Sequence, residues 1–99
     1  MGNPPPEETS YRVELTPHFE QGFKKLDRSV ASRIMKKIDR LATHPELGTE
    51  AIQNPPPDLQ GVHKLRVGDY RILLWLDHQN HLLTLYAVAH RREIYRNLR

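Results

Sequence analysis

The chain has no cysteine among its 99 residues. This absence excludes a disulfide framework, a zinc ribbon and a cysteine nucleophile. Its stability must therefore come from packing, which suits a protein that works in a reducing compartment. We accordingly expect a cytoplasmic location.

Long apolar runs are also absent. No stretch approaches the roughly 20 apolar residues of a membrane span, and the N-terminus lacks the apolar region of a signal peptide. We therefore expect no membrane partner. The length allows one domain, and a hydrophobic fraction of 37% is low but compatible with a modest core.

Acidic residues are scarce near the C-terminus. Residues 59–99 carry seven basic and three acidic side chains, a balance of +4, whereas residues 1–58 carry eight basic and nine acidic ones, a balance of −1. The basic part is suited to a polyanion such as RNA, because neutralised phosphates drive such binding. Ordinary scatter of charge over a soluble surface is the alternative.

The first two-fifths of the chain predicts a tail, a strand and two helices. Residues 1–10 are polar and rich in proline, which indicates a disordered tail ahead of a domain at 11–99. Residues 11–15 alternate between apolar and polar, as a strand does. Thr16 and Pro17 are typical of a helix start, and Asp27 is placed to begin a second helix that ends near His44, before a proline.

The remainder predicts a loop and three strands. Residues 45–60 contain three consecutive prolines and a glycine, as a loop does, and residues 62–67, 70–76 and 82–89 read as strands. A short helix or extended tail at 91–96 closes the chain. We predict an α+β fold, with a helical hairpin on one face of a small, mainly antiparallel four-stranded sheet.

A two-residue turn at Gly68-Asp69 would set the register of the first two of these strands. Arg66 then lies opposite Arg71, and Lys64 shares their face. The other face is apolar and suits the helices. Like charges opposed on a sheet are destabilising, so a cationic face without an acidic partner is suited to an anionic ligand.

These residue types match the needs of RNA cleavage without a metal. The 2′-hydroxyl is the nucleophile, so the protein must supply a base, cations for the phosphorane and an acid for the leaving oxygen. Like-charge crowding would lower the pKa of Lys64 and make it a base, and His90 titrates near neutrality. Tyr95 could donate a proton or stack on a base. Each residue alone also has an ordinary structural explanation, as solvated, surface or packing side chains.

Two segments, 64–73 and 88–95, resemble the RelE/ParE toxin superfamily, specifically its RelE-like branch. The resemblance implies a β-α-α-β-β-β fold and a toxin that cuts mRNA in the ribosomal A site, leaving a 2′,3′-cyclic phosphate. It also implies a RelB-like antitoxin as partner, with the ribosome and mRNA, and neither metal nor other cofactor.

The resemblance also assigns roles to residues. Arg71 and Arg91 would bind the scissile phosphate, Lys64 would be catalytic, and Tyr95 would stack or donate a proton. The general base stays open between Lys64 and His90. For RNA binding the predicted residues are Arg66, Arg92, Lys36 and Lys37, although a solvated helix face also explains the two lysines.

Two alternatives remain on the sequence alone. Val62 stands where the best-known RelE enzymes have a second lysine. A catalytically degenerate domain that only binds its antitoxin is therefore one alternative, and a ParE-like inhibitor of DNA gyrase, which needs no cationic cluster, is the other.

Overall fold

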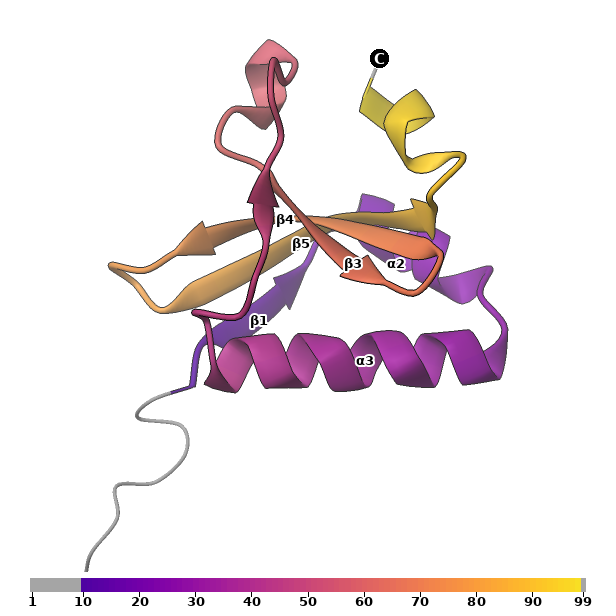
Figure 1. Ribbon diagram of the computed structural model, residues 1–99, viewed down its shortest axis with the longest axis horizontal. Coiled ribbons are helices and arrows are strands. Elements are labelled where there is room, and N and C mark those ends of the chain that lie inside the picture. Colours follow the sequence, from indigo (N-terminus) through magenta and orange to yellow (C-terminus); the bar gives the residue numbers. More distant parts are fainter. Residues whose placement is uncertain (1–9, 99) are drawn as a thin grey trace, which may run out of the picture.

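The computed structural model describes residues 10–98, arranged as a five-stranded sheet with the two α-helices on one side (Figure 1). The predicted tail thus lies, apart from Ser10, outside the described residues. The elements in chain order are β1 (Arg12–Leu15), α2 (Pro17–Lys24), α3 (Arg28–Thr43), β2 (Glu50–Ala51), η1 (Pro57–Leu59), β3 (His63–Val67), β4 (Tyr70–Asp77), β5 (Leu82–His90) and η2 (Ile94–Leu98).

The sheet has the strand order β1-β5-β4-β3-β2. β1 runs parallel to β5, and the other neighbours are antiparallel. The α+β prediction is confirmed, with one correction: the sheet has a fifth strand, because Glu50 and Ala51 leave the predicted loop to pair with Lys64 and His63.

The helices begin where the sequence predicts. The Thr16 hydroxyl accepts a hydrogen bond from the Phe19 N–H at 3.1 Å and lies 2.9 Å from the Tyr86 carbonyl oxygen, to which it donates, so the cap also ties α2 to β5. Asp27 occupies the N-cap position of α3 without a side-chain capping bond. Within the described residues, none of the helices combines the length and apolarity that crossing a membrane requires.

The β3–β4 hairpin has the predicted register. Val67 pairs with Tyr70 and Arg66 with Arg71. Gly68 has a φ of +59°, which an L side chain adopts only with strain. The guanidinium of Arg33 in α3 also occupies the space that a Cβ at this position would need, so α3 packs directly against the turn.

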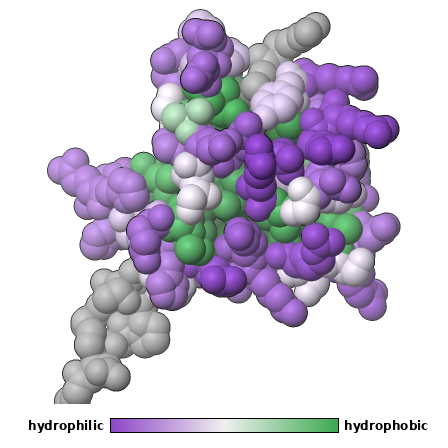
Figure 2. Space-filling view, viewed as in Figure 1, coloured by the Kyte–Doolittle hydropathy of each residue, from purple (hydrophilic) through white to green (hydrophobic). Residues whose placement is uncertain are grey.

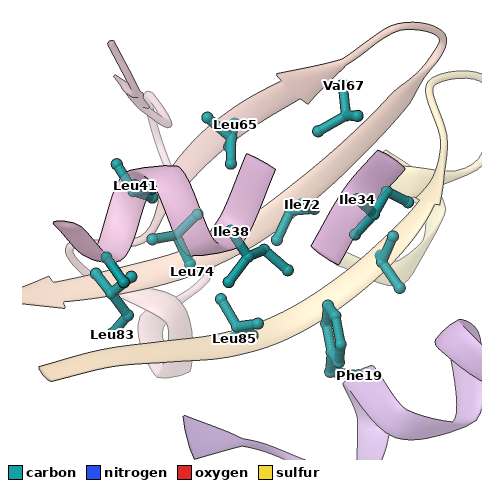
Figure 3. Close-up of a cluster of buried hydrophobic side chains, with 12 residues drawn as sticks. Phe19, Ile34, Ile38, Leu41, Leu65, Val67, Ile72, Leu74, Leu83 and Leu85 are labelled. Atoms are coloured by element: carbon teal, nitrogen blue, oxygen red, sulfur yellow. The ribbon is translucent and has the colours of Figure 1, made fainter. Parts of the chain in front are cut away.

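The main core lies between the helices and one face of the sheet (Figure 3). Ile34, Ile38 and Leu41 of α3 point towards the strands and are fully buried. Burial of each such side chain contributes about 1.5–3 kcal/mol. The sheet supplies the facing residues Leu65, Val67, Ile72, Leu74, Leu83, Leu85 and Val88.

The sequence predicts that the opposite face of the sheet is an open cationic surface, but in the structure apolar side chains cover part of it. A second, smaller core gathers there from Leu59, Val62, Leu73, Ala87 and Ile94. Residues 50–62, which we call the arm, rise from this face beside the C-terminal segment (Figure 1). The cations of β3 and β4 therefore flank a small apolar cluster.

Candidate functional site

A cavity of about 710 Å³ lies between the arm and the C-terminal segment. It brings together Lys64 of β3 and Tyr95 of η2, two of the residues predicted to act on RNA. Residues of the arm form the rest of its lining: Glu50, Ala51, Ile52, Gln53, Asn54 and Pro56.

Lys64 makes two polar contacts in this cavity. Its Nζ donates a hydrogen bond to the Tyr95 hydroxyl at 3.0 Å and lies 3.4 Å from Glu50 Oε1. The Lys64 side chain is only 20% exposed, whereas that of Glu50 is 63% exposed. The ammonium is therefore held in place by groups that flank it, while the carboxylate stays open to solvent.

These contacts overturn the predicted protonation of Lys64. The hydrogen bond to Tyr95 and the neighbouring Glu50 carboxylate outweigh the effect of partial burial, and they raise the pKa of Lys64 above 10.5. The sequence predicted a lowered pKa because it showed Arg66 and Arg71 but gave no sign of Glu50. These contacts thus favour the ammonium form of Lys64, which can stabilise negative charge.

The arginines predicted to bind phosphate gather at the β3–β4 turn. Arg71 Nη1 donates to the carbonyl oxygens of Gly68 at 2.9 Å and Tyr70 at 2.8 Å. The Arg91 N–H donates to the Asp69 carbonyl oxygen at 2.8 Å, and its Nε lies 4.0 Å from Asp69 Oδ1. Arg71 shares the sheet face of Lys64, as its register requires, but the residues that line the cavity of Lys64 and Tyr95 include neither arginine.

His90 lies on the other side of the sheet. It pairs with Tyr70 of the helix-facing set, and their rings meet edge to face with centroids 5.4 Å apart. With residues of α2 it lines a separate cavity of about 670 Å³. The structure therefore does not bring His90 together with Lys64 and Tyr95, because successive strand residues point to opposite faces.

Three of the four predicted RNA-binding residues line a groove between α3 and β3. Lys36, Lys37 and Arg66 line a hollow of about 300 Å³ together with Arg33 and Arg40. Arg92 lies apart from this groove, exposed just after β5. Hydrophilic side chains dominate the face seen in Figure 2, with smaller apolar areas between them.

Sequence reasoning missed five residues of these sites: Arg33, Arg40, Glu50, Gln53 and Asn54. Helical spacing could have found Arg33, which precedes Lys36 and Lys37 by three and four positions. The residues of the arm gave no such signal, because only the folded chain brings residues 50–54 against β3 and η2.

Comparison with known proteins agrees with this architecture. Residues 13–95 match the family described as "ParE toxin of type II toxin-antitoxin system, parDE". The chain is 26% identical over 87 residues to Toxin RelE of Mycobacterium tuberculosis (strain ATCC 25618 / H37Rv), covering 87% of each chain.

Two solved structures show the same fold. In the RelBE2 toxin–antitoxin complex of Mycobacterium tuberculosis, one chain is similar with a TM-score of 0.70 and 22% identity, over 83% of this chain and 99% of that one. In the intact RelBE complex of E. coli the TM-score is 0.65 at 17% identity, over 82% and 96%. The resemblance seen in the sequence is confirmed, and the chain belongs to the ParE toxin family of type II toxin–antitoxin systems, within the RelE/ParE superfamily.

Proposed function

We propose that this toxin is a ribosome-dependent endoribonuclease that cuts mRNA in the ribosomal A site, in a reducing cytoplasm. The observation that supports this most is the Lys64–Tyr95 pair, which places an ammonium 3.0 Å from a phenol inside a cavity on the face that carries Arg71. A protein that acts only by contact with another protein has no need of this pair.

The cleavage transfers the phosphate within the RNA. The 2′-oxygen forms a bond to phosphorus, the bond from phosphorus to the 5′-oxygen breaks, and the products are a 2′,3′-cyclic phosphate and a 5′-hydroxyl. Lys64 and the guanidiniums of Arg71 and Arg91 stabilise the charge of the phosphorane. Tyr95 gives its proton to the leaving 5′-oxygen.

The proton of the 2′-hydroxyl needs a different acceptor from the two that the sequence predicted. Lys64 is held protonated by Tyr95 and Glu50, and His90 lines the cavity on the opposite face. Glu50 lies in the same cavity as Lys64 and Tyr95, and its side chain is exposed. We therefore propose that the Glu50 carboxylate accepts the proton of the 2′-hydroxyl.

In this proposal the groove between α3 and β3 binds ribosomal RNA. Five cationic side chains line it, from Arg33, Lys36, Lys37, Arg40 and Arg66. Ribosomal RNA supplies the phosphates that such a cationic surface binds, and Arg92 adds a further contact from the end of β5. We propose a RelB-like antitoxin as the regulatory partner, since the similar folds come from RelB–RelE complexes.

A purified translation system tests the proposed activity. Wild-type protein should cut mRNA on the ribosome and leave a 5′-hydroxyl on the downstream fragment. Arg71→Ala should lower the rate by about 100-fold or more while the domain stays folded, because a donor to the developing charge is lost. Absence of cutting by the folded wild-type protein overturns the proposal, and full cutting by Arg71→Ala overturns the role of that residue.

Inhibition of DNA gyrase is the second candidate, and the match to the ParE family favours it. A supercoiling assay with purified gyrase decides the matter, because a ParE-like toxin would block the reaction without cutting any RNA. Inhibition of gyrase together with intact mRNA would establish this candidate.

A domain without catalytic activity is the third candidate. Val62, which replaces a lysine of the best-known RelE enzymes, is 1% exposed and packs in the second core. The position is therefore occupied here by a structural residue. Unimpaired growth on induced expression of the folded protein would support this candidate.

A further inference from the structure

The end of the arm presents two amide side chains to the cavity that holds Lys64 and Tyr95. Gln53 and Asn54 are both exposed and both line the cavity. No role for either follows from the sequence, because they lie in a segment that reads as a loop. Both residues line the same cavity as Lys64, so they are placed where the nucleotide of a phosphate bound at Lys64 would lie.

The arm holds this end in a fixed conformation. Asn54 has a φ of +54°, in the left-handed region, and three prolines that restrict the backbone follow it. Leu59 anchors the returning segment in the second core at 3% exposure. The Ile52 N–H donates to the Val62 carbonyl oxygen at 3.1 Å, which closes the base of the arm.

Side chains cross-link the same segment. Gln60 Nε2 donates to the carbonyl oxygens of Pro55 at 3.3 Å and Pro56 at 3.4 Å, and the Trp75 indole N–H donates to the Gln60 carbonyl oxygen at 2.9 Å. The arm is therefore tied both to itself and to β4. Groups carried on such a scaffold are placed before a ligand arrives, which is what selective recognition requires.

Amide side chains are suited to nucleobases. Each offers a donor and an acceptor without net charge, whereas phosphate is bound by cations. Asparagine and glutamine pair with the edge of adenine through two hydrogen bonds, and unstacked RNA bases expose those edges. The cavity volume of about 710 Å³ lies within the range of small-ligand sites.

We propose that Gln53 and Asn54 read the base of the nucleotide whose phosphate is held at Lys64, with a preference for adenine. This inference rests on the proposed endoribonuclease function and adds a specificity determinant to it. Lys64 and Tyr95 bind the RNA backbone in this cavity, and Gln53 and Asn54 of the arm select the base.

Mapping of cleavage sites tests the inference. The 5′-hydroxyl ends produced from one mRNA on the ribosome are sequenced for the wild type, Gln53→Met and Asn54→Gly. Methionine keeps much of the length of the glutamine without its amide, and glycine tolerates the positive φ of position 54. Gln79→Met, in the exposed β4–β5 turn, is the matched control.

The expected result concerns the base at the cut site. The wild type should favour adenine at one position of the cut site by about fivefold or more, and each arm variant should lower that preference. Gln79→Met, outside the cavity, should leave the preference unchanged and total cutting within about twofold of the wild type. An unchanged preference in both arm variants overturns the inference.

If the wild type does not cut mRNA, the proposed endoribonuclease function is overturned, and a binding measurement then tests the base selection separately. Four labelled RNA trinucleotides that differ only in the central base, with a 2′-deoxy sugar at the reactive position, are titrated with each protein by fluorescence anisotropy. Tighter binding of the adenine form by the wild type, lost in Asn54→Gly, supports the inference. Equal binding of the four, or binding of none, overturns it.

Discussion

The two faces of the sheet differ in what they are built to do. The helix side holds the larger core, in which Ile34, Ile38 and Leu41 are fully buried. The arm side holds a smaller core, with Lys64 and Tyr95 beside it. Since neighbouring residues of each strand alternate between the faces, one strand contributes half of its side chains to the larger core and the other half to the side of the candidate site.

The largest expected effect concerns stability and falls on the helix side. Ile38→Ala should lower the free energy of unfolding by about 2–5 kcal/mol, because it leaves a cavity in the larger core. Urea unfolding followed by circular dichroism measures the loss. Arg92→Ala, at an exposed site, is the control and should change stability by less than about 0.5 kcal/mol. Equal losses in the two variants would contradict this assignment of the core.

The next effect concerns cutting and contrasts the two faces directly. Tyr95→Phe removes the proposed acid and should lower the rate of mRNA cleavage on the order of 100-fold. His90→Ala, on the helix side, should leave the rate within about twofold, because it lines the other cavity. Single-turnover cleavage on ribosomes measures both. The reverse order of the two rates would assign the chemistry to His90.

A smaller effect on cutting is expected at Glu50. Glu50→Gln keeps the shape of the side chain but cannot accept a proton, and the cleavage rate should fall by about tenfold or more. A rate that is unchanged or higher would limit Glu50 to its ion pair with Lys64.

The smallest effect concerns the pH dependence of stability. Folding raises the pKa of Lys64 above 10.5, so its contacts with Tyr95 and Glu50 contribute stability that is fully present below pH 10.5 and is lost as the pH rises through the raised value. The stability difference between wild type and Lys64→Met should therefore shrink at pH values above 10.5.

Urea unfolding at pH values on both sides of 10.5 checks this expectation. Lys36→Met, on the exposed face of α3, is the control for the loss of an ammonium at the surface. A difference between wild type and Lys64→Met that grows with pH would show that the contacts of Lys64 do not stabilise its charged form.

The hairpin shows what local sequence predicts well. The Gly68-Asp69 turn sets the register, and the register sets the faces, so the positions of Lys64, Arg66 and Arg71 followed from period-two alternation. The same rule explains why His90 does not join Lys64 and Tyr95. We predicted it with the catalytic residues because histidine is a common acid and base, but its partner Tyr70 belongs to the helix side.

The arm shows what local sequence cannot predict. A two-residue strand is too short for any periodicity, and its pairing with β3 depends on contacts that form only in the folded chain. Both neighbours that set the pKa of Lys64, Glu50 and Tyr95, are remote from it in sequence. The protonation of the site and the lining of its cavity were therefore beyond reach without the structure.

Arg33 connects the groove of α3 to the turn that holds Arg71. Its guanidinium sits against Gly68, whose carbonyl oxygen accepts the hydrogen bond of Arg71. The groove of α3 and the turn that holds Arg71 are therefore joined through one side chain, and a change at Arg33 would alter the packing of that turn.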